Sequence, residues 1–384
     1  MNAIRCMAAF CLVSLPGSAW AQRNGADRPG PDDDNGYIYS VSASPTGKLI
    51  AVVGRQGRTH NDGRVSLYEV TTGAEVAARL RPGIEMVQPA FDPKGERLAV
   101  VDERGQIVFW RIVESGQTNE ERLQLLNITA LSGAVDQVVF SPRGDLFAAA
   151  CRDYVVRVDE VATNKQVVEL QGHTAAVHSV AFSPDGRYLA SAGGTDGTIR
   201  IWSTEEWELV RTLERGKAFA VDAVFTSDSR QVVAAYGDSY WPAPPVRMEY
   251  PDEQVRVWEV TSGKLLRSLR VGGDRITSMS VSPSGKLIAA GWGQKKAANV
   301  NSVVVLDAAT GERKCVLPGT GWLPPLADWC GDTRVAVVSG AAVSLWDISN
   351  VSEPKRTWTK EWSWKDDIPH TPVARVSTSE PVKH

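Results

Sequence analysis

A thirteen-residue pattern that recurs along the chain is the feature that most restricts the fold. It joins a short alternating segment to a turn of the type Ser-Pro-x-Gly and then to an apolar run, as in VSASPTGKLIAVV and VAFSPDGRYLASA. Six clear copies and a degenerate seventh begin at residues 41, 89, 138, 180, 223, 279 and 326. A self-similar unit of roughly 40 to 50 residues predicts a repeat architecture, in which each unit buries its apolar surface against the next.

Each unit contains four segments with strand character. Apolar and polar residues alternate in VHSVAF and VRVWEV, and VTTGAE and VTSGKL suit short hairpin loops. The proline and glycine of the Ser-Pro-x-Gly turn fix its backbone. Four-stranded sheets bury both faces only when they pack around a common axis, and closing the ring removes the long sheet edges. We therefore expect an all-β, seven-bladed arrangement of four-stranded antiparallel blades.

Two dipeptides at fixed places in the unit carry a family resemblance. Gly172-His173 precedes the fourth copy, and Trp346-Asp347 ends the third segment of the seventh. Together with the repeat length, they resemble the WD-repeat β-propeller family over about residues 37–363. In the other units the third segment ends in Tyr68-Glu69, Trp110-Arg111, Val158-Asp159, Trp202-Ser203, Trp258-Glu259 and Leu306-Asp307. The resemblance implies a β-propeller that is not an enzyme and acts as a protein-interaction scaffold.

The N-terminus has the pattern of an export signal. Arg5 precedes an apolar run from Cys6 to Leu15, and Ala19 and Ala21 flank Trp20 as in an A-x-A cleavage site. We expect residues 1–21 to be removed after Ala21, which places the protein in the periplasm or outside the cell. A retained anchor is the weaker alternative because the run is short for a bilayer span, and no other membrane span is expected.

The segments that flank the repeats set the expected domain limits. Residues 22–36 have the composition of a disordered leader, so the propeller should occupy residues 37–363. Because the first unit begins directly with its innermost segment, the last blade needs a fourth strand from elsewhere, and KRTWTKEW at residues 355–362 is the candidate. This predicts ring closure in simple chain order, followed by a loose tail over residues 364–384.

The fourth unit contains the residue types of a hydrolase triad, in His173, Ser191 and Asp196. The family resemblance implies a structural tetrad instead, in which they serve the buried indole N–H of Trp202, because such a donor needs an acceptor. A catalytic serine needs an exposed hydroxyl and an oxyanion hole. Ser191 lies within the strand-like YLASAG and lacks the G-x-S-x-G turn that exposes such a serine. We therefore expect no catalytic residue.

Long turns between the second and third segments of units one, five and six predict a binding surface. In this fold these turns share a face with the connections between blades, and aromatic and arginine side chains are typical of binding hot spots. We expect a protein partner of unknown identity to bind there, although the same aromatic residues could instead pack the loops onto the propeller. The candidate residues are Arg55, Arg58, Tyr240, Trp241, Arg247, Tyr250, Trp292, Lys295 and Lys296 in these three units, and Trp322 in the connection between units six and seven, PGTGWLPPL.

Composition and motifs argue against several other functions. The net charge of −3 offers no basic surface for nucleic acid. Without HExxH, CxxC or a glycine-rich phosphate loop, we expect no metal and no cofactor. The alternative function is a propeller enzyme, or a protein that binds carbohydrate or another small ligand, with a site at the mouth of the central channel near His178, Asp222 and Asp136. We expect a monomer.

Three cysteines follow the export signal. Cys151 ends an apolar run and is expected to be a small core residue. Cys315 and Cys330 fall in segments that we expect to be neighbouring strands, which leaves open whether they form a disulfide.

Overall fold

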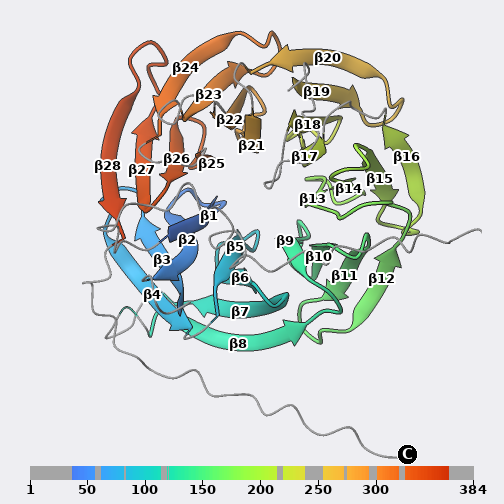
Figure 1. Ribbon diagram of the computed structural model, residues 1–384, viewed down its shortest axis with the longest axis horizontal. Helices are drawn as coiled ribbons and strands as arrows, with labels where there is room; N and C mark the ends of the chain where they lie inside the picture. Colours follow the sequence, from blue (N-terminus) through green and yellow to red (C-terminus); the bar gives the residue numbers. More distant parts are fainter. Residues whose placement is uncertain are drawn as a thin grey trace, which may run out of the picture.

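The computed structural model describes residues 37–56, 62–81, 84–113, 119, 121–213, 219–237, 254–271, 275–293, 301–319 and 325–362. These residues form seven four-stranded antiparallel sheets, which confirms the expected fold class. Figure 1 shows the sheets as blades around a central axis, with the first strand of each blade innermost and the fourth outermost. The expected signal, leader and tail, at residues 1–21, 22–36 and 364–384, lie outside the described residues.

The blades take their strands in chain order. Blade 1 consists of β1 (Tyr37–Ala43), β2 (Leu49–Gln56), β3 (Asp62–Glu69) and β4 (Glu75–Arg81). Blade 2 consists of β5 (Met86–Phe91), β6 (Arg97–Asp102), β7 (Gln106–Ile112) and β8 (Leu123–Ala130). Blade 3 consists of β9 (Val135–Phe140), β10 (Leu146–Cys151), β11 (Val156–Glu160) and β12 (Gln166–Leu170). Blade 4 consists of β13 (Ser179–Phe182), β14 (Tyr188–Ala192), β15 (Ile199–Ser203) and β16 (Leu209–Leu213).

The remaining three blades follow the same order. Blade 5 consists of β17 (Phe219–Phe225), β18 (Gln231–Gly237), β19 (Gln254–Glu259) and β20 (Leu265–Arg270). Blade 6 consists of β21 (Arg275–Val281), β22 (Leu287–Gly293), β23 (Ser302–Asp307) and β24 (Arg313–Pro318). Blade 7 consists of β25 (Leu326–Trp329), β26 (Arg334–Ser339), β27 (Ala342–Asp347) and β28 (Lys355–Glu361).

The Ser-Pro-x-Gly turns join the first and second strands. In blade 4, Ser183 Oγ accepts a hydrogen bond from the amide of Tyr188 (2.9 Å), and Gly186 adopts a φ of +73°, which glycine reaches without strain. Blade 5 has Thr226 and Ser229 in these places and keeps the turn, with Ser229 at a φ of +60°. The turn therefore survives the loss of its consensus residues, and the divergent unit still forms a blade.

Antiparallel order places the loops of every blade at two opposite ends. The turns between second and third strands, such as residues 103–105 and 152–155, share one side of the ring with the connections from each blade to the next. We call this side the connection face. It is the side on which the sequence predicts binding.

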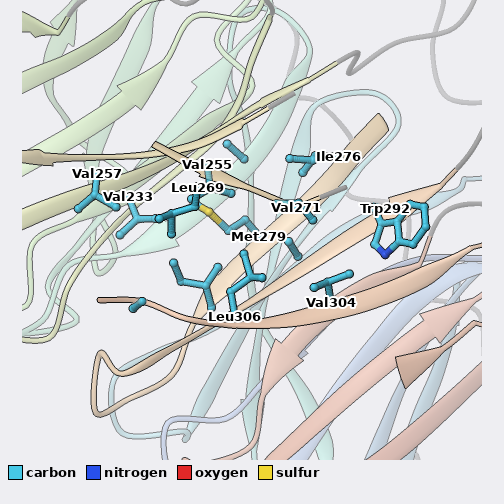
Figure 2. Close-up of a cluster of buried hydrophobic side chains, with 14 residues drawn as sticks. Val233, Val255, Val257, Leu269, Val271, Ile276, Met279, Trp292, Val304 and Leu306 are labelled. Carbon is cyan, nitrogen blue, oxygen red and sulfur yellow. The ribbon is translucent and has the colours of Figure 1, made fainter. Parts of the chain in front are cut away.

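A hydrophobic cluster fills each of the seven junctions between neighbouring blades. Figure 2 shows the cluster between blades 5 and 6, where Val233 and Val255 of blade 5 face Met279 and Leu306 of blade 6. Each blade thus buries both faces of its sheet, which an isolated four-stranded unit could not do.

The C-terminal strand closes the ring. β28 pairs with β27 as the fourth strand of blade 7, which confirms the expected closure in chain order. Two tryptophans then attach it to blade 1: Trp358 Nε1 donates to the Val70 carbonyl (3.0 Å), and Trp362 Nε1 donates to the Tyr68 hydroxyl (2.9 Å). Trp362 is 1% exposed, and the Arg64 guanidinium lies 5.0 Å from its ring centre. Closure therefore combines strand pairing with buried aromatic contacts.

The three cysteines of the described chain are free and buried. Cys315 packs in the cluster between blades 6 and 7, whereas Cys330 packs in the cluster between blades 7 and 1. The two thiols face different junctions, so the disulfide left open by the sequence is not formed. Cys151 lies in the cluster between blades 2 and 3, where burial raises the pKa of its thiol to about 11.

Candidate functional site

Four side chains form one chain of hydrogen bonds inside blade 4: those of His173, Ser191, Asp196 and Trp202. Trp202 Nε1 donates to Ser191 Oγ at 2.8 Å. The same oxygen lies 2.7 Å from His173 Nε2, and His173 Nδ1 lies 2.8 Å from Asp196 Oδ2. The strands supply the serine and the tryptophan, and loops of the connection face supply the other two.

The serine of this chain is not open to a substrate. Ser191 is 0% exposed, and its hydroxyl already serves both Trp202 and His173. Burial alone would raise the pKa of Asp196, but hydrogen bonds from His173 and Thr198 outweigh it and lower that pKa to about 2. The ionised carboxylate holds the imidazole in place. This geometry favours a structural over a catalytic interpretation.

The strand register identifies the residue that fills the place of Trp202 in each other blade. Leu189 pairs with Trp202 in blade 4, and the equivalent Phe147 of blade 3 pairs with Asp159. The sequence alignment of Val158-Asp159 with Trp202-Ser203, which puts Val158 in this place, is therefore wrong. Matching Asp159 to the aspartate of a Trp-Asp dipeptide shifted the alignment by one residue. The equivalent residues of the other blades are Tyr68, Trp110, Trp258, Leu306 and Trp346.

Polar side chains of the innermost strands link neighbouring blades around the axis. Gln88 Oε1 accepts from the amide of Val138 (3.0 Å), and Gln137 Oε1 accepts from the amide of Val180 (2.7 Å). Each bond satisfies a backbone donor on the free edge of an inner strand. These residues therefore serve as connections between blades.

Asp222, a candidate for a site at the channel mouth, belongs to the same set of links. It accepts from Ser179 Oγ (2.6 Å) of blade 4 and from the amide of Met279 (3.3 Å) of blade 6. Asp328 of blade 7 accepts from the amide of Ala43 (2.8 Å) of blade 1. Burial, with a smaller contribution from the charge of Asp222, raises the pKa of Asp328 to about 6. Sequence reasoning missed Asp328 because the degenerate seventh repeat obscures its place on an inner strand.

The other two channel-mouth candidates contact each other. His178 Nδ1 lies 2.8 Å from Asp136 Oδ2, and Arg152 Nε donates to Asp136 Oδ1 at 2.5 Å. Burial opposes ionisation of Asp136, but these two partners outweigh it and lower the carboxyl pKa. The His178 and Asp136 side chains are 24% and 15% exposed. Arg152 was not predicted, although its place in the turn after Cys151 puts it on the connection face.

Two of the ten predicted partner-binding residues lie in the described part of the chain. The expectation of a surface role for Trp292 is wrong, since it is 8% exposed and packs in the cluster between blades 5 and 6 (Figure 2), where its large apolar ring fills the junction. Arg55 lies 3.7 Å from the buried carboxylate of Glu85, which also accepts from the Tyr39 hydroxyl (3.1 Å). The residues outside the described part are Arg58, Tyr240, Trp241, Arg247, Tyr250, Lys295, Lys296 and Trp322.

The described residues lack two further features. They hold no group of three or more histidine, cysteine, aspartate or glutamate side chains arranged to bind a metal ion. They also contain no helix with the length and apolar character needed to cross a membrane.

Two protein-family models match parts of the chain. One, described as WD domain, G-beta repeat, matches residues 164–203, which include the hydrogen-bonded chain of blade 4. The other, described as Lipoprotein LpqB beta-propeller domain, matches residues 20–147. Both descriptions agree with the observed ring of sheets.

Similar proteins come from bacteria, plants and animals. An uncharacterized WD repeat-containing protein of Synechocystis sp. is 31% identical over 170 residues, which are 44% of this chain and 47% of that protein. Mouse Coronin-7 is 32% identical over 120 residues, 31% of this chain and 13% of that protein. The WD repeat-containing protein VIP3 of Arabidopsis thaliana is 28% identical over 157 residues, 40% of this chain and 48% of that protein. The chain thus spans less than half the length of each of these relatives.

Proposed function

Because the chain belongs to the WD-repeat β-propeller family, we propose that it is an exported, non-enzymatic scaffold that binds a protein partner through its connection face. Propellers of this family typically mediate protein interactions, and their shared fold does not by itself define a partner. The observation that carries the proposal is the burial of the hydrolase-like set of residues in blade 4. Ser191 is fully buried and committed to Trp202 and His173, which leaves it no catalytic role.

The binding surface is proposed on the long turns of blades 1, 5 and 6. These turns carry the aromatic and basic residues typical of protein hot spots: Arg58, Tyr240, Trp241, Arg247, Tyr250, Lys295 and Lys296, joined by Trp322 from the connection between blades 6 and 7. Pro242, Pro244 and Pro245 would restrict the backbone of their segment and so lower the entropy lost on binding. Trp292 is excluded because it is buried.

Export is proposed from the N-terminal pattern. Residues 1–21 combine a basic residue, an apolar run and an A-x-A site, which favours cleavage after Ala21. The match to a domain described as that of a lipoprotein supports a location beyond the inner membrane. N-terminal sequencing of the mature protein from an envelope fraction tests this: a chain that begins at Gln22 supports it, and a chain that begins at Met1 contradicts it.

The binding surface is tested by replacing Tyr240 and Trp241 together with alanine. The mature protein and this variant are used to capture partners from the envelope fraction, beside a control variant with Leu209 and Val210, on the outer strand of blade 4, replaced by alanine. We expect the first variant to lose the captured partner with an unchanged Tm, and the control to retain it. Equal capture by all three proteins, or a large fall in Tm of the first variant, would argue against the surface.

A ligand site at the centre of the connection face is the second candidate function. The observation that favours it is the convergence of His178 and Arg152 on the part-exposed Asp136. Calorimetry against a panel of glycans and lactones, with Asp136→Asn as the comparison, tests it. Binding that disappears in this variant would support the second function, and no binding across the panel would reject it.

A further inference from the structure

The outermost strands of the blades present free edges at the circumference of the ring. In each described sheet the fourth strand pairs with the third and has no strand partner on its other side. Unpaired edges invite pairing with other chains, and proteins commonly protect them with charged side chains or proline. Six of the seven outer strands carry at least one charge: β4, β12, β16, β20, β24 and β28.

The outer strand of blade 2 lacks this protection. β8 reads LQLLNITA, and its eight residues include no charged residue and no proline. Leu125 and Leu126 are adjacent in this strand, and each is 40% exposed. Other outer strands also expose apolar side chains, such as Leu209 and Val210 on β16, but there Arg211 lies beside them. Among the described outer strands, β8 alone combines a length of eight residues, no charged residue and two adjacent exposed leucines.

Charge indicates which chain fits this edge. When a strand whose charges all have one sign pairs antiparallel with its own copy, it brings like charges close together across the two-fold axis, which is unfavourable. β20 carries Arg267 and Arg270 without an acidic residue, so its self-pairing is opposed. β8 brings no charge to such a pairing and places the leucines of both copies together.

We propose that two copies of this protein associate through antiparallel pairing of their β8 strands. The two blades 2 would then form one eight-stranded sheet across a two-fold axis, with backbone hydrogen bonds supplying affinity and the four leucines supplying apolar contact. A dimer formed in this way differs from the monomer that the sequence predicts. Because the contact would be confined to two strand edges, we expect it to bury less than the roughly 1,200 Å² of stable interfaces. The association should therefore be reversible and concentration-dependent.

Sedimentation equilibrium of the mature protein across micromolar to millimolar concentrations tests the proposal. We expect the wild type to shift from monomer to dimer as concentration rises. Leu126→Lys and Leu126→Glu should each remain monomeric with an unchanged Tm, because each pure variant places like charges across the axis. An equimolar mixture of the two should dimerise again. Leu209→Lys on β16 is the matched control and should dimerise as the wild type does.

The outcomes separate the proposal from its rivals. A wild type that stays monomeric throughout would overturn it and leave the β8 edge for another chain. Dimerisation that survives Leu126→Lys, or that disappears with Leu209→Lys, would place the interface elsewhere and overturn it as well. Loss in both charge variants with recovery in their mixture would establish the pairing of β8 with itself.

Discussion

Blades 4 and 5 bury a tryptophan at the same place in the repeat. The indole N–H has a hydrogen-bond acceptor in blade 4 and none among the described residues in blade 5. Leu189 pairs with Trp202 in blade 4, and Val232 pairs with Trp258 in blade 5. Trp202 Nε1 donates to Ser191, two residues after Leu189. The equivalent position in blade 5 is Ala234, and Trp258 Nε1 has no hydrogen-bond acceptor among the described residues although the side chain is 1% exposed.

The same contrast extends to blades 2 and 7. Trp110 and Trp346 are also buried with no acceptor for Nε1 among the described residues, and the serine position holds Val100 and Val337. Burying a tryptophan removes about 200 Å² from water, which contributes about 5 kcal/mol at ~25 cal/mol per Å². An unpaired buried donor costs about 1–3 kcal/mol. The tryptophan is thus stabilising without the network, and among the described residues blade 4 alone has the full network.

Removing Ser191, the hydrogen-bond partner that Trp202 and His173 share, should have the largest effect on this contrast. Ser191→Ala leaves both Trp202 Nε1 and His173 Nε2 without their partner in a fully buried place, so we expect the free energy of unfolding to fall by about 3 kcal/mol. Urea denaturation followed by circular dichroism measures the change. A loss below about 1 kcal/mol would mean that the network adds little to the blade.

Asp196, the carboxylate of the blade 4 network, should make the stability of this protein depend on acidic pH. Its pKa in the folded protein is about 2, below the ordinary value of 3.8. A lowered pKa contributes stability that is present above pH ~4 and is lost as the pH falls toward 2, up to about 2 kcal/mol. We expect Asp196→Asn to remove this acid-dependent loss in denaturation curves measured from pH 5 to 2.

Asp328 supplies the control for the acid experiment, because its pKa is raised to about 6. A raised carboxyl pKa has the opposite sign, so its stabilising contribution is present below pH ~4 and is lost as the pH rises through 6. Asp328→Asn should remove the loss between pH 4 and 6 and leave the loss below pH 4 intact. Identical pH profiles for the two variants would refute both assignments.

A matched pair of substitutions compares the two indoles directly. Trp202→Phe removes apolar surface and a satisfied hydrogen bond, whereas Trp258→Phe removes similar surface together with an unpaired donor. We expect Trp202→Phe to be more destabilising by about 1–2 kcal/mol. Thermal and urea denaturation of the two variants measure the difference. If the two variants lose the same free energy of unfolding, the hydrogen bond of Trp202 adds no net stability beyond what water would offer the indole N–H in the unfolded chain.

The smallest expected effect comes from giving blade 5 an acceptor. Ala234→Ser places a hydroxyl where blade 4 has Ser191, within reach of the unpaired Trp258 N–H by analogy of register. We expect stabilisation of up to about 1 kcal/mol, visible as a raised Tm. Val233→Ser at the neighbouring position of the same strand is the control and should be destabilising. A loss of stability in Ala234→Ser would contradict the equivalence of the two positions.

Sequence patterns predicted the seven sheets and the ring closure by residues 355–362, because turns and strand alternation are local properties. The residues of the blade 4 network were implied by the family resemblance. The patterns failed where the answer depends on register or packing. Pairing with Phe147 puts Asp159, not Val158, in the place that Trp202 fills in blade 4, and Trp292 is buried because it meets a neighbouring blade. The contact of Trp362 with Tyr68 joins residues 294 positions apart, which no local pattern reveals.

The coupling between Ser191 and Trp202 tests the central claim most directly. The free energy of unfolding is measured for Ser191→Ala, Trp202→Phe and the double variant in one double-mutant cycle. If Ser191 serves as the acceptor of a buried indole, its removal should cost about 1–2 kcal/mol less once Trp202 is phenylalanine. An equal cost of Ser191→Ala in both backgrounds would contradict the structural role of the network.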